Sequence, residues 1–312
     1  MKTTSIKHST VGAKSRKRLR PGQRRGDGVA IGLTIPALVL AVGLILYPVV
    51  NTIQLSFQHW AGLGDETPAG LQNYIDLFSD GDLRVAITNN LLFAVVVTTG
   101  TVVLGTVLAL AIDRRVRFWR IYRFVFFLPY IMPITVIAIL WSNALDPNFG
   151  WITNLLGFIP GVSTGLLADP NTAIWVVCWV AIWQLAGFPM VYMLAALGAI
   201  PNEIREAALL DGAGPVQMAM RVSIPLCKDT LATVTLLQLI FSFKVFDVVQ
   251  ALTQGGPGNS TQVLGTLIYR DAFINNTFGY ASTIAVVATL IIVLISLGYL
   301  AVFKPGKIEN RG

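Results

Sequence analysis

The chain has 312 residues, of which 54% are hydrophobic and 12% are charged, and its mean hydropathy is +0.67. Soluble domains carry about 25% charged residues, so this composition excludes an ordinary soluble domain and indicates a protein of the lipid bilayer. The net charge is +7, and the two cysteines, Cys178 in an apolar run and Cys227 beside a polar insert, argue against a disulfide framework.

Six apolar runs are long enough to cross a membrane, since one helical crossing takes about 20 mostly apolar residues. The predicted fold class is therefore an all-α membrane protein with six transmembrane helices. Pro129 and Pro133 interrupt the third run, which we expect to be a kinked helix inside the bundle. The runs cover 29–50, 89–112, 124–142, 172–197, 229–252 and 277–303.

The positions of lysine and arginine predict the orientation, because cytoplasmic segments carry an excess of both. With the N-terminus inside, 20 of the 23 basic residues fall in cytoplasmic segments, and only Arg84 and Arg270 fall in outside loops. Both termini are then cytoplasmic, as is the insert between the fourth and fifth runs. Because the positive charge is spread over every cytoplasmic segment, it indicates topology and argues against nucleic-acid binding.

The sequence predicts a disordered basic cytoplasmic tail at 1–28, a transmembrane domain at 29–303 and a cytoplasmic tail at 304–312. The basic tail can contact anionic lipid headgroups, although a retention signal for topology is the favoured role.

A short amphipathic helix is predicted in the first outside loop. Leu71, Tyr74, Ile75 and Phe78 recur at helical spacing and share one face. Such a helix either lies along the membrane surface or caps the bundle.

The insert at 201–226 is too polar for a span and has the pattern of a helix–turn–helix. Pro201 suits a first helical turn, Gly212 suits the left-handed position after a helix, and Pro215 can open a second helix that "IPL" ends. The first helix places Ile204, Ala207, Ala208 and Asp211 on one side, where the small alanines allow another protein to approach closely.

The fifth run contains polar residues that are costly in a membrane and that normally face a bundle interior or a watery cavity. Lys244 and Asp247 either line that cavity or form a neutralised pair, and the sequence leaves both interpretations open. Aromatic residues of the fourth run, Tyr192 among them, are interpreted as packing or interface residues. The candidate substrate path comprises a stripe at every fourth position, Gln238, Ser242, Phe246 and Gln250, with Phe243 and Asp247 beside it.

The sequence holds no G-x-x-x-x-G-K-[ST] phosphate loop, only two widely separated histidines, and no serine–histidine–acid set within the bundle. We therefore expect no enzymatic activity, no metal and no cofactor, and we expect any ATP hydrolysis to come from a partner subunit.

The insert resembles the EAA loop of ABC importer permeases. The pattern reads Glu206-Ala207-Ala208, three residues, Gly212, nine residues, then Val222-Ser223-Ile224-Pro225, with Val and Ile where the family often has Ile and Leu. Asp211-Gly212-Ala213 is similar to carbohydrate importers of the maltose and glycerol-phosphate type. "GLQNYIDLF", "FLPYIMP", "FDVVQALTQGGPGNST" and "FGYASTIAVV" resemble the same subfamily in the same order.

The resemblance implies a permease subunit of the inner membrane that moves a sugar or sugar-like solute into the cytoplasm. It implies a second permease subunit, two copies of an ATP-binding subunit and an extracytoplasmic solute-binding protein as partners. Coupling to the ATPase would involve Glu206 as the charged contact, Ala207, Ala208 and Asp211 beside it, Gly212 as the bend and Pro225. The alternative is an ion-coupled secondary transporter that uses Asp247.

Overall fold

The computed structural model describes residues 32, 34–36, 38–112, 117–158 and 165–303, so the predicted tails at 1–28 and 304–312 lie outside the described residues. The chain divides into two compact units, residues 1–51 and residues 52–312. The described elements are helical apart from one two-stranded antiparallel sheet.

The first unit carries the first apolar run. A candidate membrane span covers Thr34–Leu55, with a mean hydropathy of 2.0, and includes the π-helical turn η1 (Val42–Leu46) and α2 (Tyr47–Leu55), which crosses the boundary between the units. The helix therefore extends five residues beyond the predicted end at residue 50. Large apolar side chains stay exposed along it, including Leu44 and Tyr47, as expected of a helix that meets lipid.

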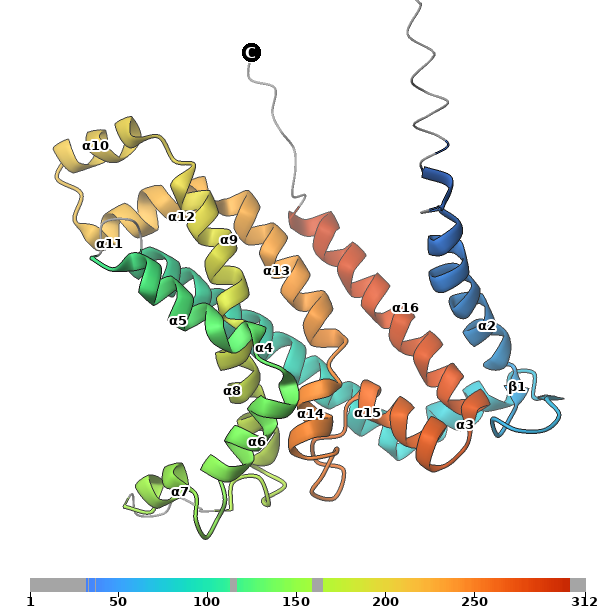
Figure 1. Ribbon diagram of the computed structural model, residues 1–312. Helices are drawn as coiled ribbons and strands as arrows, with labels where there is room; N and C mark the ends of the chain where they lie inside the picture. The colour runs from blue at the N-terminus through green and yellow to red at the C-terminus, as the bar shows by residue number, and fades with distance from the viewer. Residues whose placement is uncertain (1–31, 33, 37, 113–116, 159–164, 304–312) are drawn as a thin grey trace, which may run out of the picture. The chain divides into compact units, whose positions relative to one another are not determined.

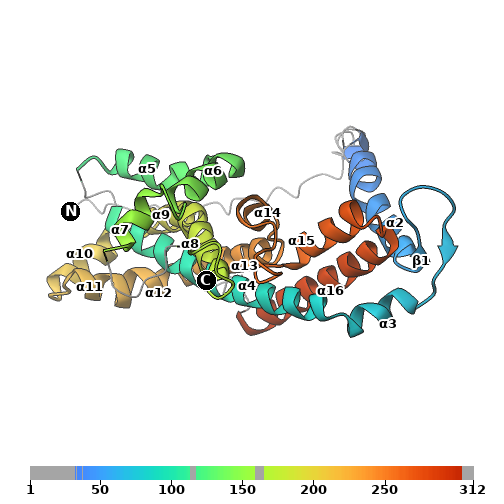
Figure 2. The ribbon, with the colours of Figure 1, turned by 90° about the horizontal axis from the view of Figure 1, so that it is seen from below.

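The second unit contains the remaining helices and the sheet, in which Gln58 pairs with Pro68 and His59 with Thr67. In chain order its elements are β1 (Gln58–His59), β2 (Thr67–Pro68), α3 (Gln72–Ser79), α4 (Gly81–Ile112), α5 (Trp119–Ile131), α6 (Ile134–Ala144), α7 (Trp151–Leu156), α8 (Ala173–Leu185), α9 (Gly187–Gly198), α10 (Asn202–Leu210), α11 (Pro215–Gln217), η2 (Met218–Ser223), α12 (Ile224–Leu226), α13 (Lys228–Phe243), α14 (Asp247–Leu252), α15 (Leu264–Tyr269), η3 (Arg270–Ile274) and α16 (Phe278–Phe303). Figures 1 and 2 show α4 extending from the helices near α10–α12 to those near α3 and α16.

Helix α4 is the axis of this unit. Three buried clusters follow one another along it: Leu83 packs with α15 and α16, Val97 with α6 and α8, and Ala109 with α9. Because α4 is apolar all round rather than amphipathic, it is suited to the centre of a bundle. The prediction of an α-helical membrane protein is confirmed.

Four of the described helical segments are long and apolar enough to cross a membrane, and the number rises to six if each of two bent pairs is one span. The upper number equals the predicted six. The single spans are Thr34–Leu55, Gly81–Ile112, Ala173–Gly198 and Phe278–Phe303, and the bent pairs are Trp119–Ile131 with Ile134–Ala144 and Pro215–Leu226 with Lys228–Phe243.

The third run is broken rather than kinked. Its two helices, α5 and α6, meet at 96°. Pro129 lies within α5, whereas the break falls at Met132, which is extended with ψ of 139°. A proline disfavours the helical region for the residue before it, so Pro133 ends α5 and Pro129 does not.

The predicted surface helix is present as α3, but its packed side differs from the predicted apolar face. Leu77 and the polar Asn73 are buried, whereas Leu71, Ile75 and Phe78 are 64%, 61% and 72% exposed. Asn73 is drawn inward because its Nδ2 donates to the carbonyl oxygens of Ser56 and Gln58, at 3.0 and 2.9 Å. Tyr74, the fourth residue of the predicted face, is half-buried, and its hydroxyl lies 2.7 Å from Ser56 Oγ. The predicted face is therefore divided, with one residue packed on the unit and three exposed, and both interpretations of the helix remain predictions.

The contact between α4 and α9 depends on a glycine. A Cβ atom on Gly105 would lie 2.7 Å from Pro189 Cβ and 2.8 Å from the carbonyl oxygen of Ala186. Small residues let membrane helices approach in this way, and the glycine thus sets the distance between these two helices.

We expect Gly105→Val to lower the thermal stability of the purified protein in detergent, because an added side chain must push α9 away, at a cost of about 1–3 kcal/mol. Gly298→Val is the matched control, since a Cβ there meets nothing within 4 Å. Melting temperatures from intrinsic tryptophan fluorescence measure the difference, and equal melting of both variants and the parent contradicts the packing.

Candidate functional site

Residues 201–226 form a helical hairpin at the end of the second unit where α9 ends and α13 begins (Figure 1). Pro201 is the N-cap of α10 and has an extended ψ of 141°. Gly212 has a φ of +79°, the left-handed conformation that glycine adopts without strain. The amide of Ala213 donates to the carbonyl oxygen of Ala208 at 3.0 Å and closes the turn. The predicted left-handed glycine is confirmed.

The second arm of the hairpin is longer than predicted. Gly214 caps it, Pro215 opens it, and the chain stays helical through α11, η2 and α12 to Leu226, so "IPL" does not end the helix. Pro225 is accommodated because the wider π-helical turn η2 precedes it and relieves the loss of one backbone donor. The arm ends at Cys227, where the axis bends by 74° into α13.

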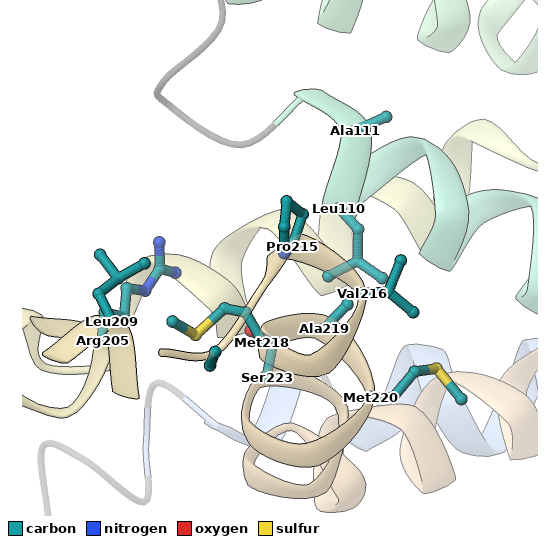
Figure 3. Close-up of a pocket in the computed structure, with 11 residues that line it drawn as sticks. Leu110, Ala111, Arg205, Leu209, Pro215, Val216, Met218, Ala219, Met220 and Ser223 are labelled. Atoms are coloured by element: carbon teal, nitrogen blue, oxygen red, sulfur yellow. The ribbon is translucent and has the colours of Figure 1, made fainter. Parts of the chain in front are cut away.

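The two arms and the end of α4 enclose a pocket of about 540 Å³. In Figure 3, Arg205 and Leu209 extend into it from α10, Met218 and Ser223 come from the second arm, and Leu110 comes from α4. The Nη2 of Arg205 donates to the carbonyl oxygen of Leu197 at 2.6 Å, which ties α10 to the last turn of α9. The hairpin is therefore held to α4 and α9 at its base.

The outer side of the hairpin is exposed. No residue of α10 is buried, and Leu210 is 89% exposed; Val216 and Met220, which line the pocket from the second arm, are also 75% and 62% exposed. Such apolar side chains beside exposed carboxylates are typical of a protein-binding surface. Among the sequence-predicted site residues, Glu206, Ala207 and Asp211 are exposed, Ala208 is half-buried, and Pro225 lies apart from them in α12.

The fifth apolar run is interrupted, because α13 ends at Phe243 and α14 begins at Asp247. The buried amide of Asn90, in α4, bridges the interruption. Its Nδ2 donates to the carbonyl oxygen of Phe243 at 2.9 Å, and its Oδ1 accepts from the backbone N–H of Leu264 at 2.8 Å. Gly265 also lets α15 approach, since a Cβ there would lie 2.6 Å from the carbonyl oxygen of Val245.

Because the fifth run is interrupted between α13 and α14, the prediction of one polar stripe along a continuous helix is wrong. Gln238 and Ser242 lie on α13 and are each 1% exposed, and the Thr98 hydroxyl of α4 donates to Ser242 Oγ at 3.2 Å. Half-buried Phe246 lies in the interruption, and half-buried Gln250 lies on α14. Phe243 is also buried. The structure thus divides the predicted set between two elements and a linker.

Lys244 and Asp247 are both exposed, and no ion pair joins them in the described part of the chain. Asp247 stands in the first turn of α14, where a carboxylate interacts favourably with the helix dipole. The neutralised pair considered from the sequence is therefore absent from these described residues.

Two features were missed by sequence reasoning. Asn89 and Asn90 are adjacent amides at the edge of an apolar run, and intramembrane polar residues are the signal that identifies them. The second is an aromatic cluster. The ring of Phe188 lies 4.7 Å from Tyr192 and 5.9 Å from Phe241, and Tyr192 and Phe241 remain 41% and 48% exposed.

Comparison with known proteins gives consistent relatives. The family model described as "Binding-protein-dependent transport system inner membrane component" matches residues 101–307. The chain is 36% identical over 280 residues to the probable ABC transporter permease protein YurN of Bacillus subtilis, covering 88% of this chain and 96% of YurN. It is 32% identical to the multiple sugar-binding transport system permease protein MsmF of Streptococcus mutans, covering 85% and 91%. A bacterial ABC transporter involved in the import of the acidic polysaccharide alginate has the same fold, with a TM-score of 0.79, 22% identity and 92% and 98% coverage.

We expect Asn90→Leu to destabilise the bundle, because it leaves the carbonyl of Phe243 and the N–H of Leu264 buried without their partner, at about 1–3 kcal/mol for each group. Asn143→Leu is the control, since Asn143 is exposed and its Nδ2 bonds only to Ile139 of its own helix. Thermal melting in detergent tests the comparison. If Asn90→Leu melts like Asn143→Leu, the bridge contributes nothing.

Proposed function

The chain belongs to the family of binding-protein-dependent transport system inner membrane components, and we propose that it is a permease subunit of an ABC importer for a sugar or sugar-like solute. The observation that carries this proposal is the exposed hairpin 201–226, which offers a protein-binding surface on an otherwise apolar bundle. The solute class is inferred from the MsmF relative, a permease of a multiple sugar-binding transport system, and from the alginate importer of the same fold.

The proposed assembly contains this chain, a second permease subunit, two copies of an ATP-binding subunit and an extracytoplasmic solute-binding protein. The chain itself has no phosphate-binding loop in its sequence, so the ATPase subunits supply the energy. The family's dependence on binding proteins supports an outside partner that delivers the solute.

The hairpin is proposed to face the cytoplasm and to be the docking element for an ATPase subunit. Basic residues gather at that end of the second unit, including Arg117, Arg120, Arg205 and Lys228, which agrees with a cytoplasmic location. Glu206 would be the charged contact, and Ala207 the small residue that permits close approach. Because Arg205 and the pocket tie the hairpin to α9 and α4, a push on α10 would move the bundle with it.

The substrate path is proposed to run along the exposed aromatic cluster and past the interruption of the fifth run. The rings of Tyr192 and Phe241 can stack on the apolar faces of a sugar, and Asp247 and Gln250 can bind its hydroxyl groups. Ser242 would join the path only after α13 moves away from α4, since it is buried and bonded to Thr98 of α4, and Gln238 is equally buried.

The alternative of an ion-coupled transporter that uses Asp247 is disfavoured by the family. It also predicts transport by this chain alone, and it leaves the exposed hairpin without a partner.

Co-expression with its ATPase and second permease tests the assembly. We expect an ATPase subunit to purify with the chain, and we expect Glu206→Lys to uncouple ATP hydrolysis from uptake at normal membrane insertion, because it reverses the charge at the docking surface. Asp229→Lys is the control, an exposed acid at the same end but on α13. Uptake by the chain without any ATPase, or normal coupling in Glu206→Lys, contradicts the proposal.

Cysteine labelling tests the path in a variant without Cys178 and Cys227. Cysteines at 192, 241 and 250 should react with a water-soluble thiol reagent, because thiolates form only where water reaches. Leu294, 68% exposed on α16 and set in an apolar sequence, is the lipid-facing control. The path lies elsewhere if only the control cysteine reacts. It also lies elsewhere if the cysteines at 192, 241 and 250 stay unlabelled in every state of the ATPase cycle.

A further inference from the structure

A second pocket, of about 450 Å³, lies at the opposite end of the second unit from the hairpin. It opens where the β1–β2 loop, α3 and the turn before α16 come together (Figures 1 and 2). Its polar and aromatic lining includes His59, Trp60, Asp65, Asp76, Asn276 and Tyr280.

The walls of this pocket are held in place by buried contacts. Asn73 is 2% exposed, and its Nδ2 donates to the carbonyl oxygens of Ser56 and of Gln58, the first residue of β1. The N–H of Gly279 donates to the carbonyl oxygen of Trp60 at 3.2 Å, and the rings of Trp60 and Phe278 lie 5.4 Å apart. The pocket is therefore a fixed part of this unit rather than a gap between loose loops.

The pocket carries unbalanced negative charge. No cation within the described residues pairs with Asp65 or Asp76, and Asp76 accepts one hydrogen bond, from Gln72 Nε2 at 2.7 Å. The hydroxyl of Tyr280 donates to Asp80 at 2.9 Å, which brings a third carboxylate close. The guanidinium of Arg270 is already engaged by Asp82 at 2.7 Å.

Asp271 adds less negative charge near the pocket than an ordinary aspartate would. It is 4% exposed, and burial raises the pKa of its carboxyl, an effect that the hydrogen bond from Asn275 and the charge of Arg270 offset in part. The unbalanced charge therefore rests on Asp65, Asp76 and Asp80.

The rim of the pocket bears an exposed apolar residue. Leu63 is 90% exposed and stands between Gly62 and Gly64, whose φ angles are +90° and +83°. An apolar side chain displayed on a tight turn beside a charged pocket suits contact with a protein surface better than contact with a small neutral solute.

We propose that this pocket receives a lysine or arginine side chain of the extracytoplasmic solute-binding protein, and that Leu63 packs against the surface around it. The proposal rests on the proposed function, which supplies the partner. Carboxylates attract the cation, and the ring faces of Trp60 and Tyr280 can bind it by cation–π interaction. A neutral sugar would leave the carboxylates without a counter-charge, so the charge complementarity favours the basic side chain.

The test uses the complete transporter in lipid nanodiscs with the binding protein of its own transport system, loaded with solute. The double variant Asp65→Asn, Asp76→Asn should raise the binding-protein concentration for half-maximal ATPase stimulation by about tenfold. It should also weaken the dependence of that concentration on salt, while basal ATPase activity stays unchanged. Glu66→Gln is the matched control, because it removes one exposed carboxylate next to Asp65 but outside the pocket.

A second measurement does not depend on the folding of the carboxylate double variant. Leu63→Cys, in the otherwise unchanged chain, should react severalfold faster with a cationic thiol reagent than with an anionic one of similar size, and bound binding protein should block both. Equal rates for the two reagents, or an unchanged half-maximal concentration in the double variant, overturns the proposal. Protection of this cysteine by free sugar alone overturns it in favour of a sugar site. A failed assembly with the ATPase is a separate result, which counts against the proposed function and not against this pocket.

Discussion

The bridge made by the Asn90 amide is the interaction on which the middle of the bundle depends. A helix that stops inside apolar surroundings exposes backbone groups that water cannot reach, and each must find a partner. Asn90 supplies an acceptor and a donor at once, for Leu264 N–H and for the carbonyl oxygen of Phe243. Its neighbour Asn89 donates to the carbonyl oxygens of Ser260 and Gln262, both at 2.9 Å. One turn of α4 thus holds both the interruption of the fifth run and the loop that follows it.

This arrangement makes α4 and α13 the connection between the two ends of the second unit. Helix α4 begins directly after Asp80, which accepts a hydrogen bond from Tyr280 of the acidic pocket, and Leu110 and Ala111 in its last turn line the pocket of the hairpin. Helix α13 begins at Lys228, directly after the hairpin and the N-cap residue Cys227, and stops at the interruption. We infer that a movement imposed on the hairpin reaches the interruption through two continuous helices, while the groups bridged by Asn90 limit how far α13 can move without α4.

The sequence predicted features that depend on neighbouring residues and missed those that depend on distant ones. The left-handed Gly212 and the hairpin followed from local propensity, because a glycine between two helical patterns has few other roles. The interruption at Lys244 did not, since hydropathy averaged over a run cannot detect a break whose stabilising partner, Asn90, lies 153 residues away from Phe243. The 96° bend at Pro133 was underestimated for a similar reason, because the proline marks the position but packing sets the angle.

The burial of Gln238 and Ser242 has a consequence for how this chain would contribute to recognition. Ser242 Oγ accepts from the Thr98 hydroxyl of α4, and Gln238 Nε2 has no hydrogen-bond partner among the described residues. The exposed side of the same helix presents Phe241, next to Phe188 and Tyr192 of α9. A sugar that passed this surface would meet rings first, and rings discriminate poorly between hydroxyl patterns. On the proposed substrate path, this surface would therefore contact the faces of a sugar with little selectivity between hydroxyl patterns.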